Sequence, residues 1–264
     1  MTLGSAFRRA VSFCILVTFH TAFAVEGPSD EHALPCRPTI ACTADIVPPG
    51  DFEIEVGYLL RRFRDTTLQH STPLLMKLTL ATWAQLQVGS NGGIFASGPA
   101  PAKYLDDILV GIKLHLHDQE PRFPSLSFSA TLSIPTPAQP EALRTYDLEM
   151  IAYITKDISK VHADLNLGLN VWQLSAPSIQ IWAALALSVE LPRHTCVMAE
   201  GYLYGDAGPI APSDAGLLLA ACWTPRSFVT LDAGIDVGLE HARIVSAFVG
   251  MTVIPVRFWH PRSH

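Results

Sequence analysis

The feature that most constrains the fold of this chain is a two-residue alternation of apolar and polar side chains, which recurs from Asp51 onward. A clear example has apolar residues at every second position, namely Val161, Ala163, Leu165, Leu167, Leu169 and Val171. The intervening residues are small or polar: His162, Asp164, Asn166, Gly168 and Asn170. Because successive side chains of a strand point to opposite faces, the pattern predicts strands with one apolar and one polar face, and helical spacing would mix the two kinds.

About twelve segments carry this alternation, and most are long. Their expected spans are 51–64, 69–79, 83–90, 104–117, 123–135, 144–156, 160–173, 178–191, 194–204, 213–223, 226–238 and 243–256. A tilted strand needs roughly 9–11 residues to cross a bilayer. The sequence therefore predicts an all-β fold, a transmembrane antiparallel up-and-down β-barrel of about twelve strands.

The connections between these segments differ in length in an alternating way. Short turns are expected at 80–82, 157–159, 192–193 and 224–225, with a slightly longer one at 118–122. Longer loops are expected at 65–68, 91–103, 136–143, 174–177, 205–212 and 239–242. Short turns at one end and longer loops at the other are typical of bacterial outer-membrane barrels, and an even strand number places both termini on the periplasmic side.

A soluble β-sandwich is the rival fold, because its strands also alternate. Three features favour the barrel. Most of the expected strands run to ten or more residues, which is the length that a tilted membrane strand needs. The low charge of the chain, 16% charged residues against about 25% in an average globular domain, indicates that it faces apolar surroundings. The polar faces are also rich in Ser, Thr, Asn and Gly, which suits a barrel interior better than a solvated sandwich face.

The N-terminal region has the pattern of a secretory signal peptide. Arg8 and Arg9 precede an apolar stretch over 11–23, and Ala22-Phe23-Ala24 is a small-residue cleavage site. We therefore expect a signal peptide over 1–24, an irregular periplasmic segment over the Pro-rich residues 25–50, and the barrel over 51–259. The expected location is the bacterial outer membrane, with its lipid and the barrel-assembly machinery as partners.

Four cysteines remain after the signal peptide, an even number in an oxidising compartment. Cys36 and Cys42 close a short loop and can pair locally, with metal binding as the less favoured alternative. Cys196 and Cys222 are each 13 residues from Pro209, so they should face each other across a hairpin. We expect them to be neighbours on the inner face near the periplasmic rim, where they are candidates for a disulfide.

Alternation also predicts which polar residues face the lumen. The charged and histidine candidates are Glu53, Glu55, Arg61, Lys77, Asp107, Lys113, His115, Asp147, Glu149, His162, Asp164, Glu190, Glu200, Asp232 and Asp236. Acids outnumber bases. We favour a network of paired side chains filling a narrow barrel, and a polar path biased toward cations or neutral polar groups is the functional alternative.

No residue pattern indicates catalysis. The G-x-S-x-G, H-E-x-x-H and Walker motifs do not occur in the sequence. His115 and His117 form an H-x-H pair, but a zinc site usually needs at least three protein ligands. We therefore expect no enzyme activity, no cofactor, no metal and no nucleic-acid partner.

Three blocks of sequence together resemble a known family. They are FEIEVGY at 52–58, STPLLMKLTLATWAQLQVGS at 71–90 and SFVTLDAGIDVGLEHARIVSAFVGMTV at 227–253. They look like the outer-membrane barrels described as transporters of the meta pathway of phenol degradation. The matching residues are Leu231, Asp232, Ala233, Gly234, Gly238, Leu239, Phe248, Gly250 and Thr252. The sequence departs at Gln85 and Gln87, where that family often carries charge, and in the five residues after Trp259.

The resemblance implies a barrel that transports small, aromatic or other hydrophobic compounds, and it carries over no substrate ligand. We accordingly expect a channel or transporter for small molecules. The alternative from another class is a structural outer-membrane barrel with a plugged lumen and no transport. A soluble periplasmic β-binding protein ranks third.

Overall fold

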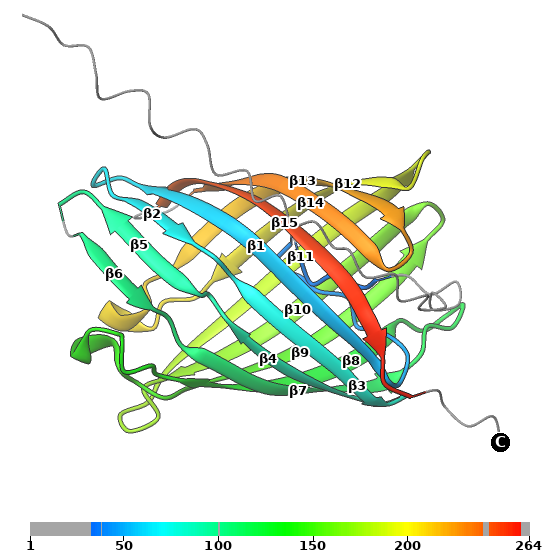
Figure 1. Cartoon of the computed structure of the whole chain (residues 1–264), viewed down its shortest axis with the longest axis horizontal. Coiled ribbons are helices and arrows are strands. Elements are labelled where there is room, and N and C mark those ends of the chain that lie inside the picture. Colours follow the sequence, from blue (N-terminus) through cyan, green and yellow to red (C-terminus); the bar gives the residue numbers. More distant parts are fainter. Residues whose placement is uncertain (1–32, 38, 100, 240–242, 260–264) are drawn as a thin grey trace, which may run out of the picture.

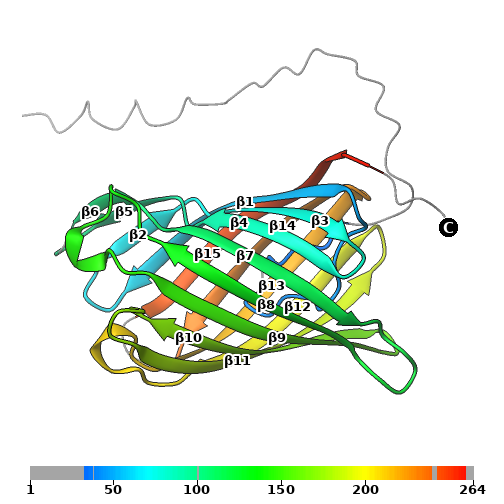
Figure 2. The ribbon, with the colours of Figure 1, turned by 90° about the horizontal axis from the view of Figure 1, so that it is seen from below.

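A computed structural model of the chain describes residues 33–37, 39–99, 101–239 and 243–259. The signal peptide expected over 1–24 lies outside the described residues. The described chain is a closed antiparallel β-barrel whose strands are strongly tilted (Figures 1 and 2).

One sheet holds all the described strands. They are β1 (Asp51–Phe63), β2 (Leu68–Ser71), β3 (Leu74–Ala81), β4 (Ala84–Ser90), β5 (Gly93–Ser97), β6 (Ala102–Leu105), β7 (Ile108–His117), β8 (Ser125–Ile134), β9 (Asp147–Ile158), β10 (Val161–Trp172), β11 (Ser178–Leu191), β12 (Thr195–Tyr204), β13 (Asp214–Arg226), β14 (Val229–Gly238) and β15 (Arg243–Arg257). From β7 to β15, each strand pairs with the next strand along the chain. β4 pairs with β3 and β7, β1 pairs with both β2 and β3, and β15 pairs antiparallel with β1 to close the barrel.

Interrupted strands reconcile these elements with a barrel of 12 strands. β2 and β3 both pair with β1 and are separated by Thr72 and Pro73. Proline cannot donate to a strand ladder, which explains the break. β5 and β6 pair with each other and extend β4 and β7 beyond one end of the wall. The predicted fold class and strand number are confirmed.

Two predicted connections differ from the structure. The segment 91–103, expected to be a loop, contains β5 and the first half of β6. These strands have only five and four residues, which is too few to show a clear alternation. The turn expected at 224–225 lies instead at 227–228, since β13 continues to Arg226. The ladder between β13 and β14 shifts register between Trp223 and Arg226. Pro225 lies in this bulge, which is where strands tolerate proline.

The outer wall is apolar. Side chains such as Leu167, Ile181, Leu217, Leu219 and Val249 are exposed on it. A surface of this kind is stable only against lipid or another apolar partner. Aromatic side chains are exposed as well, namely Tyr58, Phe128, Tyr146, Trp223 and Trp259. Within the described residues, no helix has the length and apolar character needed to cross a membrane.

The inner wall is polar and largely buried. Glu53, Lys77, Lys113, Thr155 and Asn166 are at most 2% exposed, although they face the barrel interior. Barrels of about eight strands are filled by their own side chains, and wider barrels leave space. Here that space is occupied by residues 33–37 and 39–49, which run inside the barrel (Figures 1 and 2).

This position differs from the periplasmic segment expected over 25–50. The described part of it is irregular, as expected, but its contacts are with the lumen. We call residues 33–49 the plug. It enters beside Ser227, whose carbonyl accepts a hydrogen bond from the Ala33 N–H at 2.8 Å. It leaves where the Gly50 N–H donates to Thr79 O at 2.8 Å. Both contacts are at the end of the barrel with short turns, here called the turn end; the opposite end is the loop end.

Both expected cysteine pairs are present. Cys36 is bonded to Cys42 within the plug. Cys196 of β12 is bonded to Cys222 of β13, and the two residues are directly paired in the strand register. The equal spacing from Pro209 thus predicted the register of this hairpin.

Candidate functional site: the plugged lumen

The plug is fastened to the wall through its backbone. Three acidic side chains accept hydrogen bonds from its N–H groups. Glu53 accepts from Leu34 at 2.8 Å, and Glu55 accepts from Cys36 at 2.9 Å. Glu200, across the barrel on β12, accepts from both Ile40 and Ala41, at 2.8 and 2.5 Å. Hydrogen bonds to an ionised acceptor are roughly twice as strong as neutral ones, so these carboxylates are the main anchors of the first half of the plug.

The second half of the plug is held from β7, β8 and β9. The Lys113 ammonium donates to Thr43 O at 2.5 Å and to Asp45 O at 3.2 Å. The Ser127 hydroxyl donates to Ala44 O, and the Ala44 N–H donates to Thr155 Oγ1 at 2.7 Å. An irregular segment has no ladder to satisfy its peptide groups, so the wall must supply their partners. Strand alternation provides them on the inner face.

Lys77 connects the plug to an ion cluster of the wall. Its ammonium contacts Glu53 and lies 2.5 Å from Glu55, and it donates to Leu34 O at 2.7 Å. Glu53 faces Lys77 in the register of β1 and β3. Two acids on one strand therefore meet one base on its neighbour, and the plug completes the cluster. Pairing of this kind offsets the cost of burying the three charges.

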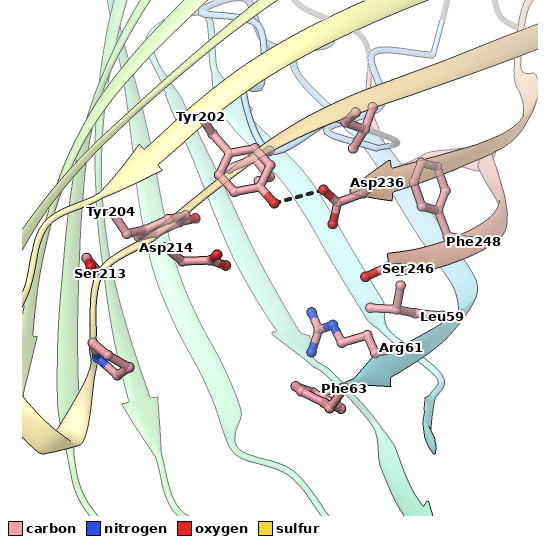
Figure 3. A pocket seen from close by; sticks show the side chains of 13 residues that line it. Leu59, Arg61, Phe63, Tyr202, Tyr204, Ser213, Asp214, Asp236, Ser246 and Phe248 are labelled. Atoms are coloured by element: carbon pink, nitrogen blue, oxygen red, sulfur yellow. Dashed lines mark hydrogen bonds between the residues drawn. The ribbon is translucent and has the colours of Figure 1, made fainter. Parts of the chain in front are cut away.

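A cavity of about 480 Å³ lies at the loop end, and Ile40 of the plug is among the residues that line it (Figure 3). We call it the vestibule. Arg61 projects into it from β1, and Asp214 and Asp236 face it from β13 and β14. The Tyr202 hydroxyl donates to Asp236 Oδ1 at 2.8 Å. Its apolar lining is Leu59, Phe63, Tyr204, Leu218 and Phe248. The vestibule can therefore accommodate a small molecule with both polar and apolar groups.

A smaller cavity, of about 170 Å³, lies on the turn-end side of the plug. Its lining includes Ala41 and Arg37 of the plug, and His162 and Asp164 of β10. Ile40 lines the vestibule and Ala41 lines this cavity. The plug thus separates two hollows at the two residues that Glu200 holds.

The structure places most of the predicted lumen residues on the inner face. Those that contact the plug are Glu53, Glu55, Lys77, Lys113, His115 and Glu200. Those that line a cavity or lie near one are Arg61, His162, Asp164, Asp232 and Asp236. Asp107 and Asp147 lie near the loop end, where they accept from Gln139 and the Gln173 N–H, and Glu149 shares the face of Asp147. Glu190 is exposed at the turn end of β11.

Several contacting residues were not predicted. Arg37, Tyr202 and Trp182 all pack in or against the lumen. Tyr202 and Trp182 lie at alternating positions of their strands like their inward-facing neighbours, but they were not among the predicted lumen residues. Arg37 had no sequence signal, since nothing local indicates that an irregular segment folds inward.

Catalytic or metal-binding geometry is not evident in the part of the chain that the structure describes. There, no three His, Cys, Asp or Glu side chains gather closely enough to hold a metal ion. His115 Nδ1 instead lies 3.3 Å from Ala44 O of the plug, and its Nε2 lies 2.8 Å from Asp118. His115 is thus engaged with the plug and a turn.

Comparison with known proteins supports the fold. No known family profile matches the chain, and no curated protein sequence matches it. Among solved structures, an outer-membrane channel from Pseudomonas putida F1 aligns with 80% of this chain and 97% of its own, with a TM-score of 0.61 and 13% identity. An anion-selective porin from Comamonas acidovorans aligns with 77% of this chain and 98% of its own, with a TM-score of 0.37 and 11% identity. The first likeness shows that this chain has the fold of an outer-membrane β-barrel.

Proposed function

We propose that the protein is a passive channel of the bacterial outer membrane for small molecules, and that the plug restricts its passage. The observation that carries the proposal is the alignment of two cavities on either side of the plug, at Ile40 and Ala41. A plug that moves away from Glu200 would join them into one polar path. The exported, membrane-inserted state expected from the N-terminal pattern and the apolar outer wall is part of this proposal, as are the outer-membrane lipid and the barrel-assembly machinery as partners.

The hydrogen bonds that hold the plug are compatible with its release from the wall. The anchors at Glu53, Glu55 and Glu200 are hydrogen bonds to backbone groups. Water can replace each such bond, so its net contribution is only about 1.5–3 kcal/mol even with a charged partner. The buried apolar side chains of the plug are mostly small, as at Ala33, Ala41 and Ala44, so its release would expose little apolar surface.

Two observations favour an aromatic or hydrophobic substrate. The resemblance to transporters linked to phenol degradation implies aromatic or other hydrophobic compounds. The rings of Phe63, Tyr204 and Phe248 in the vestibule are compatible with such a solute. These rings surround the approach to the plug, where a passing solute would first leave bulk water.

A structural barrel with no transport is the second candidate, because the plug is fastened on both sides of the lumen, by Glu200 and by Lys113. Uptake into liposomes containing the purified, folded protein separates the two. The panel should include neutral, aromatic, anionic and cationic solutes of similar size, with protein-free liposomes as the control. A channel gives uptake above the control for some of these solutes. Uptake equal to the control for every solute, also after substitution of Glu200, would support the structural candidate.

A further inference from the structure

We propose that the inner wall contains a binding site for a guanidinium or ammonium group, centred on Asp232, and that the plug's own Arg37 fills it in this structure. We call it the Asp232 slot; it is formed by Asp232, Gly57, Gly250 and Phe248. The binding site is inferred from the geometry of these residues alone. Its consequence, that small organic cations are a preferred substrate class, rests on the channel function proposed above.

Asp232 provides the charge. It lies on β14 with its side chain 1% exposed, and Arg37 Nε is 3.9 Å from its Oδ1. The Arg37 guanidinium also lies over the ring of Phe248, with Cζ 6.0 Å from the ring centroid. A buried carboxylate beside an aromatic face is a favourable environment for an organic cation, because both attract positive charge.

Two glycines shape the slot. Gly57 of β1 and Gly250 of β15 are directly paired where the barrel closes. A Cβ on Gly57 would lie 2.5 Å from Arg37 Cζ, and one on Gly250 would lie 2.8 Å from Arg37 Nε and 2.7 Å from Asp232 Oδ2. No side chain other than glycine leaves room there for a flat group against the backbone. The wall is therefore shaped to admit a guanidinium beside Asp232.

Arg37 fills the slot imperfectly. Within the part of the chain that the structure describes, both carboxylate oxygens of Asp232 lack a hydrogen-bond partner. The Nε–H of Arg37 lacks one as well. Burying an ionised group without hydrogen bonds is costly. The backbone on either side of Arg37 is held by Glu55 and Glu200, which restricts how closely its side chain can approach. A free cation has no such tether and can donate directly to Asp232.

The location suits a channel. Arg37 lines the cavity on the turn-end side, and Phe248 lines the vestibule on the loop-end side. Figure 3 shows Phe248 at the edge of the vestibule near Asp236. The slot thus lies between the two hollows, at the level of the plug. A small organic cation that displaces Arg37 would occupy the position through which the joined path runs.

Binding of ethylguanidinium, compared with its neutral analogue ethylurea, tests the slot. The protein is the full chain in its folded state in detergent, with Arg37→Ala to vacate the slot. We expect the Arg37→Ala variant to bind ethylguanidinium at least about tenfold more tightly than ethylurea, measured by calorimetry. Adding Asp232→Asn should abolish this preference. Adding Glu190→Gln, which removes an exposed carboxylate at the turn end, should preserve it.

Equal affinity for the two ligands in the Arg37→Ala variant, or a preference that survives Asp232→Asn, would show that Arg37 and Asp232 form only a structural ion pair. A second measurement needs no substitution. In the wild-type protein, ethylguanidinium should compete with Arg37 and speed amide hydrogen exchange of the plug more than ethylurea does. No difference between the two ligands would overturn the proposal in this test as well.

Uptake separates the slot from the channel function. Selective binding of ethylguanidinium without uptake of any solute of the panel into liposomes would contradict the channel and leave the slot intact. Uptake of both ligands at the same rate, with no binding preference, would leave the channel intact and exclude the slot. Selective binding together with faster uptake of ethylguanidinium is the result that both proposals predict.

Discussion

Lys77 shows how a buried charge of the lumen depends on a small number of specific partners. Lys77 contacts Glu53 and Glu55 and is 2% exposed. Such a cluster adds little net stability compared with apolar packing, because its desolvation cost offsets its attraction. Removing one member has a large effect, because the remaining charges stay buried without a partner.

Lys77→Met tests this at the residue scale. It leaves Glu53 and Glu55 without their cation, so we expect a loss of about 3–5 kcal/mol in the free energy of unfolding. Urea unfolding of the protein in lipid vesicles measures it. Lys103→Met, which removes a lysine lying over the exposed ring of Phe95 outside this cluster, is the matched control and should change stability far less. Equal effects of the two substitutions would contradict the role given to Lys77.

Sequence could identify most of these residues but not their partners. The inward position of Glu53, Lys77 and Lys113 follows from strand alternation. That Lys113 donates to plug carbonyls, or that Arg37 reaches Asp232, depends on contacts between residues 68 to 195 positions apart, which local patterns do not encode.

At the scale of elements, the plug and the strands follow different rules. A strand is fixed by its ladder on both sides, whereas the plug is held by separate hydrogen bonds and by the packing of small side chains against the wall. The strands were therefore predictable from periodicity, and β11 was placed at its observed bounds of Ser178–Leu191. The plug was predicted to be irregular, but its position inside the barrel was not predicted. Its peptide groups bond to side chains of six described strands, β1, β3, β7, β8, β9 and β12, and no repeating sequence pattern marks these contacts.

Glu200→Gln should loosen the plug. The substitution keeps the shape of the side chain and removes its charge, which weakens the bonds from Ile40 and Ala41 by about 1 kcal/mol. We expect amide exchange at Ile40 and Ala41 to become about fivefold faster, measured by hydrogen exchange with mass spectrometry. Glu190→Gln is the control and should leave this exchange unchanged. Protection of both amides as in the wild type would show that Glu200 does not anchor the plug.

Each disulfide stabilises one element or one pair of elements: Cys36–Cys42 closes a loop within the plug, and Cys196–Cys222 links β12 to β13. Peptide mapping without reduction should recover Cys36 linked to Cys42 and Cys196 linked to Cys222. Mixed linkages between the two pairs would contradict both the strand register and the local loop of the plug. Free thiols at 196 and 222 would remove that bond but not the pairing of the strands.

At the scale of the whole molecule, an apolar outer wall, a polar inner wall and a plug form three concentric layers. The first two follow from one alternating sequence pattern, which is why the barrel and its 12 strands could be predicted. The third arises because a barrel of this size has more interior than its own side chains fill. The plug fills part of this interior and leaves one cavity on each side.

The most direct test of the central claim is the single-channel conductance of the protein in planar bilayers, with and without residues 33–46. Heat-modifiable migration on gels first establishes that both forms are folded barrels. We predict that the shortened form conducts through openings clearly larger than those of the full chain, because its two cavities are joined. Equal conductance of the two forms, or none in either, would contradict a lumen restricted by the plug.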